Sequence, residues 1–184
     1  LPSAGGGPGA GGLLAGRPPN VALSRHGQRA AERQQAAQSE FLAVANDSHS
    51  RTLVGLGALL FLLGLLTGAL VPAVRSPRIG LSAHLEGVMN GTFLMVLGAI
   101  WHHVHLSQPL SRLCFSLLVY GTFANWLSVL LGAAFGAGRM MPIAGGGLTA
   151  QPWQEFVVGF GLISLSVAMV VGCGLLTWGL LRRT

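Results

Sequence analysis

Four long apolar runs, separated by short polar connections, fill most of the chain after residue 50. The clearest is Thr52–Val74, which contains 23 residues without a charge between Arg51 and Arg75. About 20 apolar residues are enough for one helix to cross a bilayer. The runs therefore predict an all-α membrane protein, a bundle of four transmembrane helices over about 52–74, 79–101, 113–138 and 156–181.

The amino-acid composition also indicates that most of the chain lies in a lipid bilayer. Of 184 residues, 51% are hydrophobic and only 9% are charged, whereas an ordinary soluble domain carries about 25% charged residues. The net charge of +6 comes from 11 arginines, and there is no lysine. These arginines lie at the ends of apolar runs or in the N-terminal segment and form no single basic face, which argues against a nucleic acid partner.

Residues 1–50 differ in composition from the predicted transmembrane domain, residues 51–184. They are rich in glycine, proline and alanine up to Pro19 and then in arginine and glutamine. Such a segment has too few apolar residues to bury a core. We expect a disordered leader, with a short surface helix over residues 25–44 as the alternative.

Arginine placement indicates how the spans are oriented, because cytoplasmic connections carry an excess of basic residues. Four crossings place both termini on one side of the membrane. The side with the termini holds five arginines near the spans, and the opposite side holds three. The five are Arg33, Arg51, Arg112, Arg182 and Arg183, and the three are Arg75, Arg78 and Arg139. We expect an integral protein of the bacterial inner membrane with cytoplasmic termini.

The second run carries three polar side chains inside the segment Ser82–Gly91, namely His84, Glu86 and Asn90. An ionisable group in mid-membrane costs about 2.5 kcal/mol or more, so such residues usually mark a site. At 100° per residue, Glu86 and Asn90 share one helix face and His84 lies on another. This helix is therefore expected to present imidazole to one neighbour, and carboxylate plus amide to another. The alternative is that these groups only join neighbouring helices.

The other runs add two further candidate site residues. Asn125 lies deep in the third run, where an amide needs a partner, and Tyr120 lies about 140° away on a different face. Tyr120 is equally compatible with an aromatic contact in the bundle. Gly64 and Gly68 form a pair suited to close helix contact.

The residue types at the ends of the runs predict where these residues lie relative to the membrane. Trp101 is expected at a membrane interface, followed by the solvated histidines His102, His103 and His105. The glycine-rich loop Arg139–Gly147 is expected to fold back over the bundle as a lid.

Four stretches in the same order resemble the hydroxylaminobenzene mutase family. They are Leu-Leu-Thr-Gly at 65–68, Ser-Ala-His-Leu-Glu-Gly-Val-Met-Asn-Gly at 82–91, Tyr-Gly-Thr-Phe-Ala-Asn-Trp at 120–126 and Met-Met-Pro-Ile-Ala at 140–144. The resemblance covers about residues 51–181. It implies an intramolecular hydroxyl-transfer enzyme that converts a small aromatic substrate, an arylhydroxylamine, to a 2-aminophenol.

A more distant resemblance is to styrene oxide isomerase, through Ala83-His84, five residues, then Asn90-Gly91. That family forms trimers that hold haem b between subunits. The resemblance implies a homotrimer in which His84 is the metal ligand and binds the cofactor, with Asn90 facing the substrate. The tyrosine of the isomerase active site aligns with Val129, which favours the mutase.

Together these arguments predict Asn90, Asn125, Glu86 and Tyr120 as catalytic residues around ferric haem held by His84. The iron would act as a Lewis acid. Glu86, Asn90 and Asn125 would hold the amino group or move a proton, unless Glu86 only anchors its helix. Two alternatives stay open: a haem-dependent aryl epoxide isomerase that yields an aldehyde, and a non-enzymatic haem-binding membrane protein.

Overall fold

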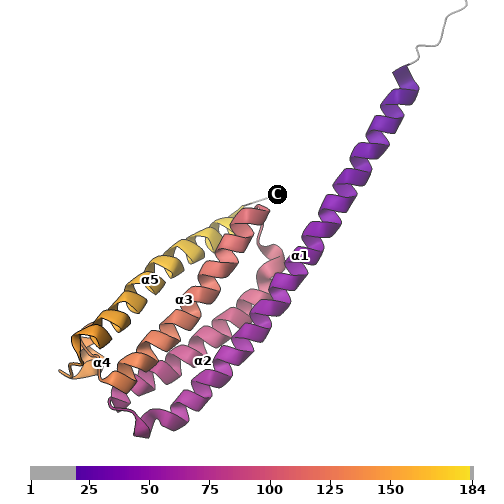
Figure 1. The fold of residues 1–184 in the computed structure, drawn as a ribbon. Helices are drawn as coiled ribbons and strands as arrows, with labels where there is room; N and C mark the ends of the chain where they lie inside the picture. The colour runs from indigo at the N-terminus through magenta and orange to yellow at the C-terminus, as the bar shows by residue number, and fades with distance from the viewer. Residues whose placement is uncertain (1–19, 183–184) are drawn as a thin grey trace, which may run out of the picture. The chain divides into compact units, whose positions relative to one another are not determined.

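The computed structural model describes residues 20–182, a range that is helical with no strand (Figure 1). The prediction for residues 1–19 lies outside this range. The elements follow in the order α1 (Asn20–Leu70), the 3₁₀ turn η1 (Val71–Ala73), α2 (Pro77–Ile100), the 3₁₀ turn η2 (Trp101–His103), α3 (Gln108–Phe135), the short α4 (Pro142–Gly145) and α5 (Pro152–Leu181).

Four helical segments in the described range are long and apolar enough to cross a membrane. They are Ser48–Ala73, Pro77–His103, Gln108–Phe135 and Pro152–Leu181. All four predicted spans are therefore confirmed to within a few residues. The described part of this membrane protein, residues 20–182, contains helices and no strand.

The chain divides into two compact units, Leu1–Phe41 and Leu42–Thr184. In the first unit the described residues, 20–41, belong to α1. Residues 20–50, predicted as part of a disordered leader, are therefore helical. Alanine, glutamine, glutamate and arginine dominate this stretch and all favour helix, and its last proline is Pro19. The second unit contains the four spans.

Proline and glycine set the ends of the later helices. Each of α2, α3 and α5 has proline in its first turn, where the missing N–H costs no hydrogen bond. For this reason α3 begins at Gln108 and α5 at Pro152, earlier than predicted. Gly136 ends α3 with φ of 72° and donates its N–H to the Gly132 carbonyl, so the helix stops before the predicted residue 138.

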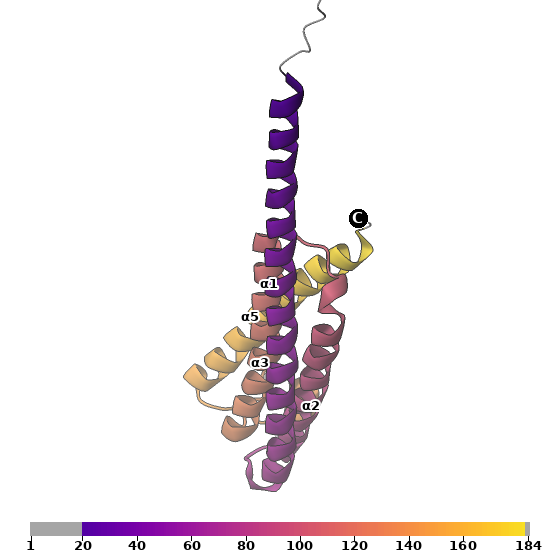
Figure 2. The same cartoon turned by 90° about the vertical axis from the view of Figure 1, so that its right-hand side faces the viewer.

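Glycines bring α1 and α2 together. A Cβ added at Gly64 would lie 2.6 Å from the backbone nitrogen of Val88, and one added at Gly91 would lie 2.7 Å from the carbonyl oxygen of Gly57. The predicted contact role of Gly64 is confirmed. Because no side chain intervenes, the two backbones run next to each other over this stretch, as both views show (Figures 1 and 2).

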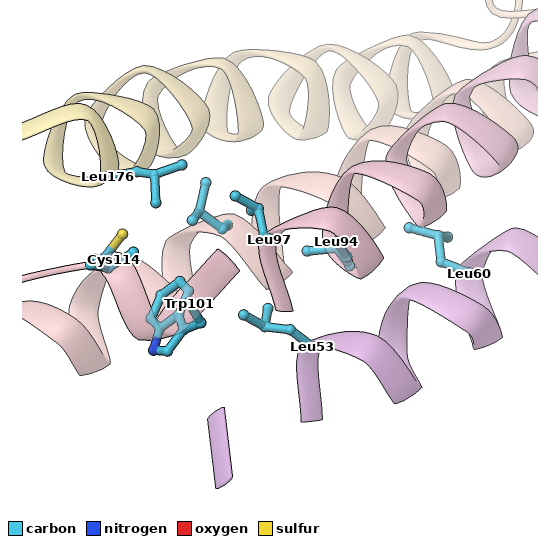
Figure 3. Packing of buried hydrophobic residues seen from close by; sticks show 9 residues of the cluster. Leu53, Leu60, Leu94, Leu97, Trp101, Cys114 and Leu176 are labelled. Atoms are coloured by element: carbon cyan, nitrogen blue, oxygen red, sulfur yellow. The ribbon is translucent and has the colours of Figure 1, made fainter. Parts of the chain in front are cut away.

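A second set of contacts joins all four spans in an apolar core near the end of α2. Its buried members are Leu53, Leu60, Leu94, Leu97, Trp101, Val104, Cys114, Leu118 and Leu176. Figure 3 shows the packing of this cluster between the helices. Trp101 is 0% exposed, and its indole lies edge-on to the rings of His49 of α1 and Phe115 of α3. Its place at a membrane interface stays a prediction.

The connection between α3 and α5 folds back onto the bundle, as expected. Met141 packs on the cluster formed by Ile79, Ala83, Val129 and Ala133. Glu155 of α5 fixes the connection from the other side, because its carboxylate accepts the backbone N–H groups of Arg139 at 3.3 Å and Ala150 at 3.0 Å. A role for this loop as a lid stays a prediction.

The contact between α1 and α2 predicts a large effect for a single methyl group. A Cβ at Gly87 would lie 2.5 Å from Gly64 Cα, and backbone atoms cannot move aside locally. We expect Gly87→Ala to destabilise the protein by about 1–3 kcal/mol, measured as thermal unfolding in detergent. Gly174→Ala is the matched control, since nothing lies within 4 Å of the added carbon. Equal stability of the two variants would contradict the contact.

Candidate functional site

His84 faces α1 and is held there by one hydrogen bond. Its Nδ1 lies 2.8 Å from the carbonyl oxygen of Gly64. A carbonyl oxygen can only accept, so Nδ1 carries the hydrogen and donates it. The neutral ring then has its lone pair on Nε2, which makes no hydrogen bond to any residue in the described range.

Gly68, one turn after Gly64, provides the space for this ring. A Cβ added there would lie 2.7 Å from His84 Nδ1 and 3.0 Å from Cε1. The predicted pair of small residues thus has two separate roles. Gly64 allows backbone contact and offers its carbonyl, whereas Gly68 leaves room for the imidazole.

The other polar face of α2 meets α3. Oε2 of Glu86 accepts the side-chain N–H groups of Asn125 at 2.5 Å and Asn90 at 3.3 Å. The carboxylate therefore joins an amide from its own helix to one from the next. Sequence periodicity predicted both the separation of Glu86 and Asn90 from His84 and a partner for Asn125, and the structure confirms both.

Trp126 and Thr67 join α1 directly to α3, a contact that the sequence did not reveal. The indole Nε1 of Trp126 donates to Thr67 Oγ1 at 3.1 Å, and Thr67 donates in turn to the Leu63 carbonyl at 2.8 Å. The indole also covers Gly87, where an added Cβ would lie 2.9 Å from its Cδ1. The His84 face and the Glu86 face therefore lie on either side of a tight three-helix contact.

The four site residues are only half-buried within this chain. His84, Glu86, Asn90 and Asn125 are all of intermediate exposure, and the neighbouring Met89 is 65% exposed. Neither asparagine Oδ1 makes a hydrogen bond within residues 20–182. The acceptors left over within the described residues therefore include the two Oδ1 atoms, Glu86 Oε1 and His84 Nε2.

Tyr120 is not part of this group. Its hydroxyl lies 2.8 Å from Ser164 Oγ on α5, and Ser164 already donates to the Gly161 carbonyl at 3.0 Å. Tyr120 must therefore be the donor. The predicted difference in face between Tyr120 and Asn125 is confirmed, whereas a catalytic role for Tyr120 stays a prediction.

The histidines after the second span lie apart from the site. His102, His103 and His105 are exposed, as expected for residues at a membrane surface. The rings of His102 and His103 lie side by side, with 3.8 Å between their centroids and a tilt of 44° between their planes.

A groove of about 860 Å³ lies along the first turns of α5. Its lining combines the polar end of the loop with an apolar wall, and consists of Arg139, Met140, Thr149, Ala150, Pro152, Glu155, Phe156, Gly159, Phe160 and Ile163. None of the predicted site residues lines it.

Comparison with known proteins places this arrangement in a family. The profile described as styrene oxide isomerase matches residues 49–181, which include all four spans and every site residue discussed above. The chain belongs to the styrene oxide isomerase family. The more distant of the two sequence resemblances is thereby confirmed.

Two named relatives of this family member come from Ectopseudomonas oleovorans. Hydroxylaminobenzene mutase HabB is 54% identical over 132 residues, which cover 71% of this chain and 80% of that protein. Hydroxylaminobenzene mutase HabA is 46% identical over 127 residues, or 68% of this chain and 94% of that protein. No solved structure shows significant similarity to the chain. This family member is therefore an enzyme of the isomerase or mutase type.

The packing of His84 against Gly68 gives a direct test of the imidazole geometry. In Gly68→Ala the new methyl must displace the ring, and the Nδ1 hydrogen bond to Gly64 should be lost. Nitrogen NMR of histidine-labelled protein in bilayers should report this change in the His84 signal. Gly55→Ala, on the same helix with nothing within 4 Å, should leave that signal unchanged. A wild-type signal in Gly68→Ala would refute the packing.

Proposed function

We propose that this protein is a hydroxylaminobenzene mutase, which converts arylhydroxylamines to 2-aminophenols within the membrane. The observation that carries the proposal is the pairing of an oriented imidazole with a cluster of amides on the next face of the same helix. The two relatives that bear this name at 54% and 46% identity support the same substrate class.

We also propose haem b as the cofactor, which His84 would hold. The donor chemistry fits, because a metal-ligating histidine usually donates its second ring N–H to a carbonyl or carboxylate. Here Gly64 accepts that bond, which leaves Nε2 as the ligating atom. Ferric haem would supply a Lewis acid for the oxygen-bearing group of the substrate.

The residues of the chain would position the substrate and exclude water. In the overall reaction the N–O bond breaks, oxygen joins the ortho carbon, and the hydrogen displaced there is balanced by one gained at nitrogen. No oxidant or reductant is consumed. Asn90 and Asn125 would accept hydrogen bonds from the N–H and O–H groups, and the position of the cluster inside a span keeps bulk water from capturing the reacting ring.

The partial exposure of the site supports a homotrimer with the site at a subunit interface. A polar cluster that faced lipid would carry a desolvation cost of several kcal/mol. A second copy of the chain would cover the half-buried side chains and complete the site. We place the protein in the bacterial inner membrane with cytoplasmic termini, as the arginine distribution favours.

An aryl epoxide isomerase is the second candidate, supported by the family profile. Val129, which aligns with the tyrosine of that enzyme, is 5% exposed and packs in an apolar cluster with Ala83 and Ala133. It offers no hydroxyl to an epoxide oxygen. This favours the mutase.

The role of His84 can be tested by absorption spectroscopy. Purified protein should show a haem spectrum, and His84→Ala should lose both the spectrum and the activity because the ligand is removed. His102→Ala, which changes an exposed histidine in the 3₁₀ turn after α2, should keep both. Full haem content and full activity in His84→Ala would refute this role.

Substrate class can be decided by direct turnover. Protein reconstituted in bilayers should convert hydroxylaminobenzene to 2-aminophenol, identified by chromatography. Styrene oxide should react at least about tenfold more slowly, the factor expected for one lost hydrogen bond of about 1.4 kcal/mol. Faster conversion of styrene oxide to the aldehyde would favour the second candidate instead.

A further inference from the structure

Glu86 has an unusual bonding pattern for a carboxylate inside a span. One of its oxygens, Oε2, accepts two amide N–H groups, one from Asn90 and one from Asn125. A carboxylate is an acceptor only, so both asparagines must turn their nitrogen toward it. The orientation of two side-chain amides is thus fixed by a single residue.

This amide orientation determines which atoms the two asparagines can offer to a ligand. An amide that directs Nδ2 at Glu86 directs Oδ1 away from it, and neither Oδ1 has a partner within the described residues. The cluster therefore presents both amide oxygens as hydrogen-bond acceptors, while one N–H of each amide is committed to Glu86. Groups in a span that lack partners strongly favour a complementary ligand.

We infer that Glu86 is a positioning residue that determines substrate selectivity, by holding the amides of Asn90 and Asn125 as acceptors toward the substrate. This inference rests on the proposed function. An arylhydroxylamine carries N–H and O–H donors that match two acceptors, whereas an epoxide carries none. A site built to accept hydrogen bonds discriminates strongly against a ligand without donors.

Substitution separates positioning by Glu86 from proton transfer by Glu86. Positioning requires an acceptor at the place of Oε2, which holds two donors at 2.5 and 3.3 Å, whereas proton transfer requires a carboxylate. Glutamine, which keeps a side-chain carbonyl acceptor, should preserve much of the positioning effect. Leucine, which has no acceptor, should abolish it.

The experiment compares Glu86→Gln and Glu86→Leu in the full chain, reconstituted in bilayers. We expect Glu86→Gln to keep kcat/KM for hydroxylaminobenzene within about tenfold of wild type, and Glu86→Leu to lose about a hundredfold, the factors for one and two hydrogen bonds. Thr92→Val is the matched control, because Thr92 bonds only to its own helix at the Val88 carbonyl. The kcat/KM of Thr92→Val for hydroxylaminobenzene should equal that of wild type.

A binding readout separates positioning from general damage to the fold. Calorimetry would compare 2-aminophenol, which has donors, with 1,2-dimethoxybenzene, the same ring without them. Wild type and Glu86→Gln should prefer 2-aminophenol by about tenfold or more, and Glu86→Leu should lose the preference. If Glu86→Leu does not fold, Glu86→Gln decides whether Glu86 acts by positioning. A preference for 2-aminophenol equal to that of wild type would support positioning, and its loss would overturn it.

The outcomes distinguish failure of this inference from failure of the proposed function. Equal, severe loss in both Glu86 variants would assign proton transfer to Glu86 and overturn the positioning role, with the mutase activity intact. Full activity and preference in Glu86→Leu would overturn it as well. Absence of hydroxylaminobenzene turnover by wild type would overturn the proposed function itself.

Discussion

The close approach of α1 to α2 is the contact on which the site depends. At Gly64 the backbone of α1 lies against Gly87 and Val88 of α2 with no side chain between them. Only at that separation can the Gly64 carbonyl lie 2.8 Å from the imidazole of His84. In a bilayer, where burying apolar surface drives helix association weakly, such backbone contact contributes much of the packing. The glycines therefore stabilise the bundle and orient the histidine through the same surface.

The absence of water in the bilayer explains how the polar groups are distributed over α2. Each group needs a partner on a neighbouring helix, because lipid provides none. His84 finds a carbonyl on α1, whereas Glu86 finds an amide on α3. The helical period thus directs the imidazole of His84 to one neighbouring helix and the carboxylate of Glu86 to another.

Much of this arrangement was predictable from sequence, because it follows from length, polarity and helical period. The four spans, the two faces of α2 and the need for a partner at Asn125 all depend on these properties. The burial of Trp101 and the bond from Trp126 to Thr67 depend instead on how each helix is rotated against its neighbours, which no single segment encodes. Helices α3 and α5 begin before the charge-free apolar runs, because Pro109 and Pro152 favour a first helical turn ahead of them.

Gly87 fixes the position of the two polar faces of α2 relative to α1 and α3. On one side an added Cβ would reach Gly64 of α1, and on the other it would reach the indole of Trp126 on α3. That indole is itself bonded to α1 through Thr67. Helix α2 is thereby held from both sides within one turn of His84 and Glu86. Because both residues belong to this same rigid turn, the imidazole nitrogen and the acceptor cluster keep a fixed relation, which a site that moves a group between two atoms of one small molecule requires.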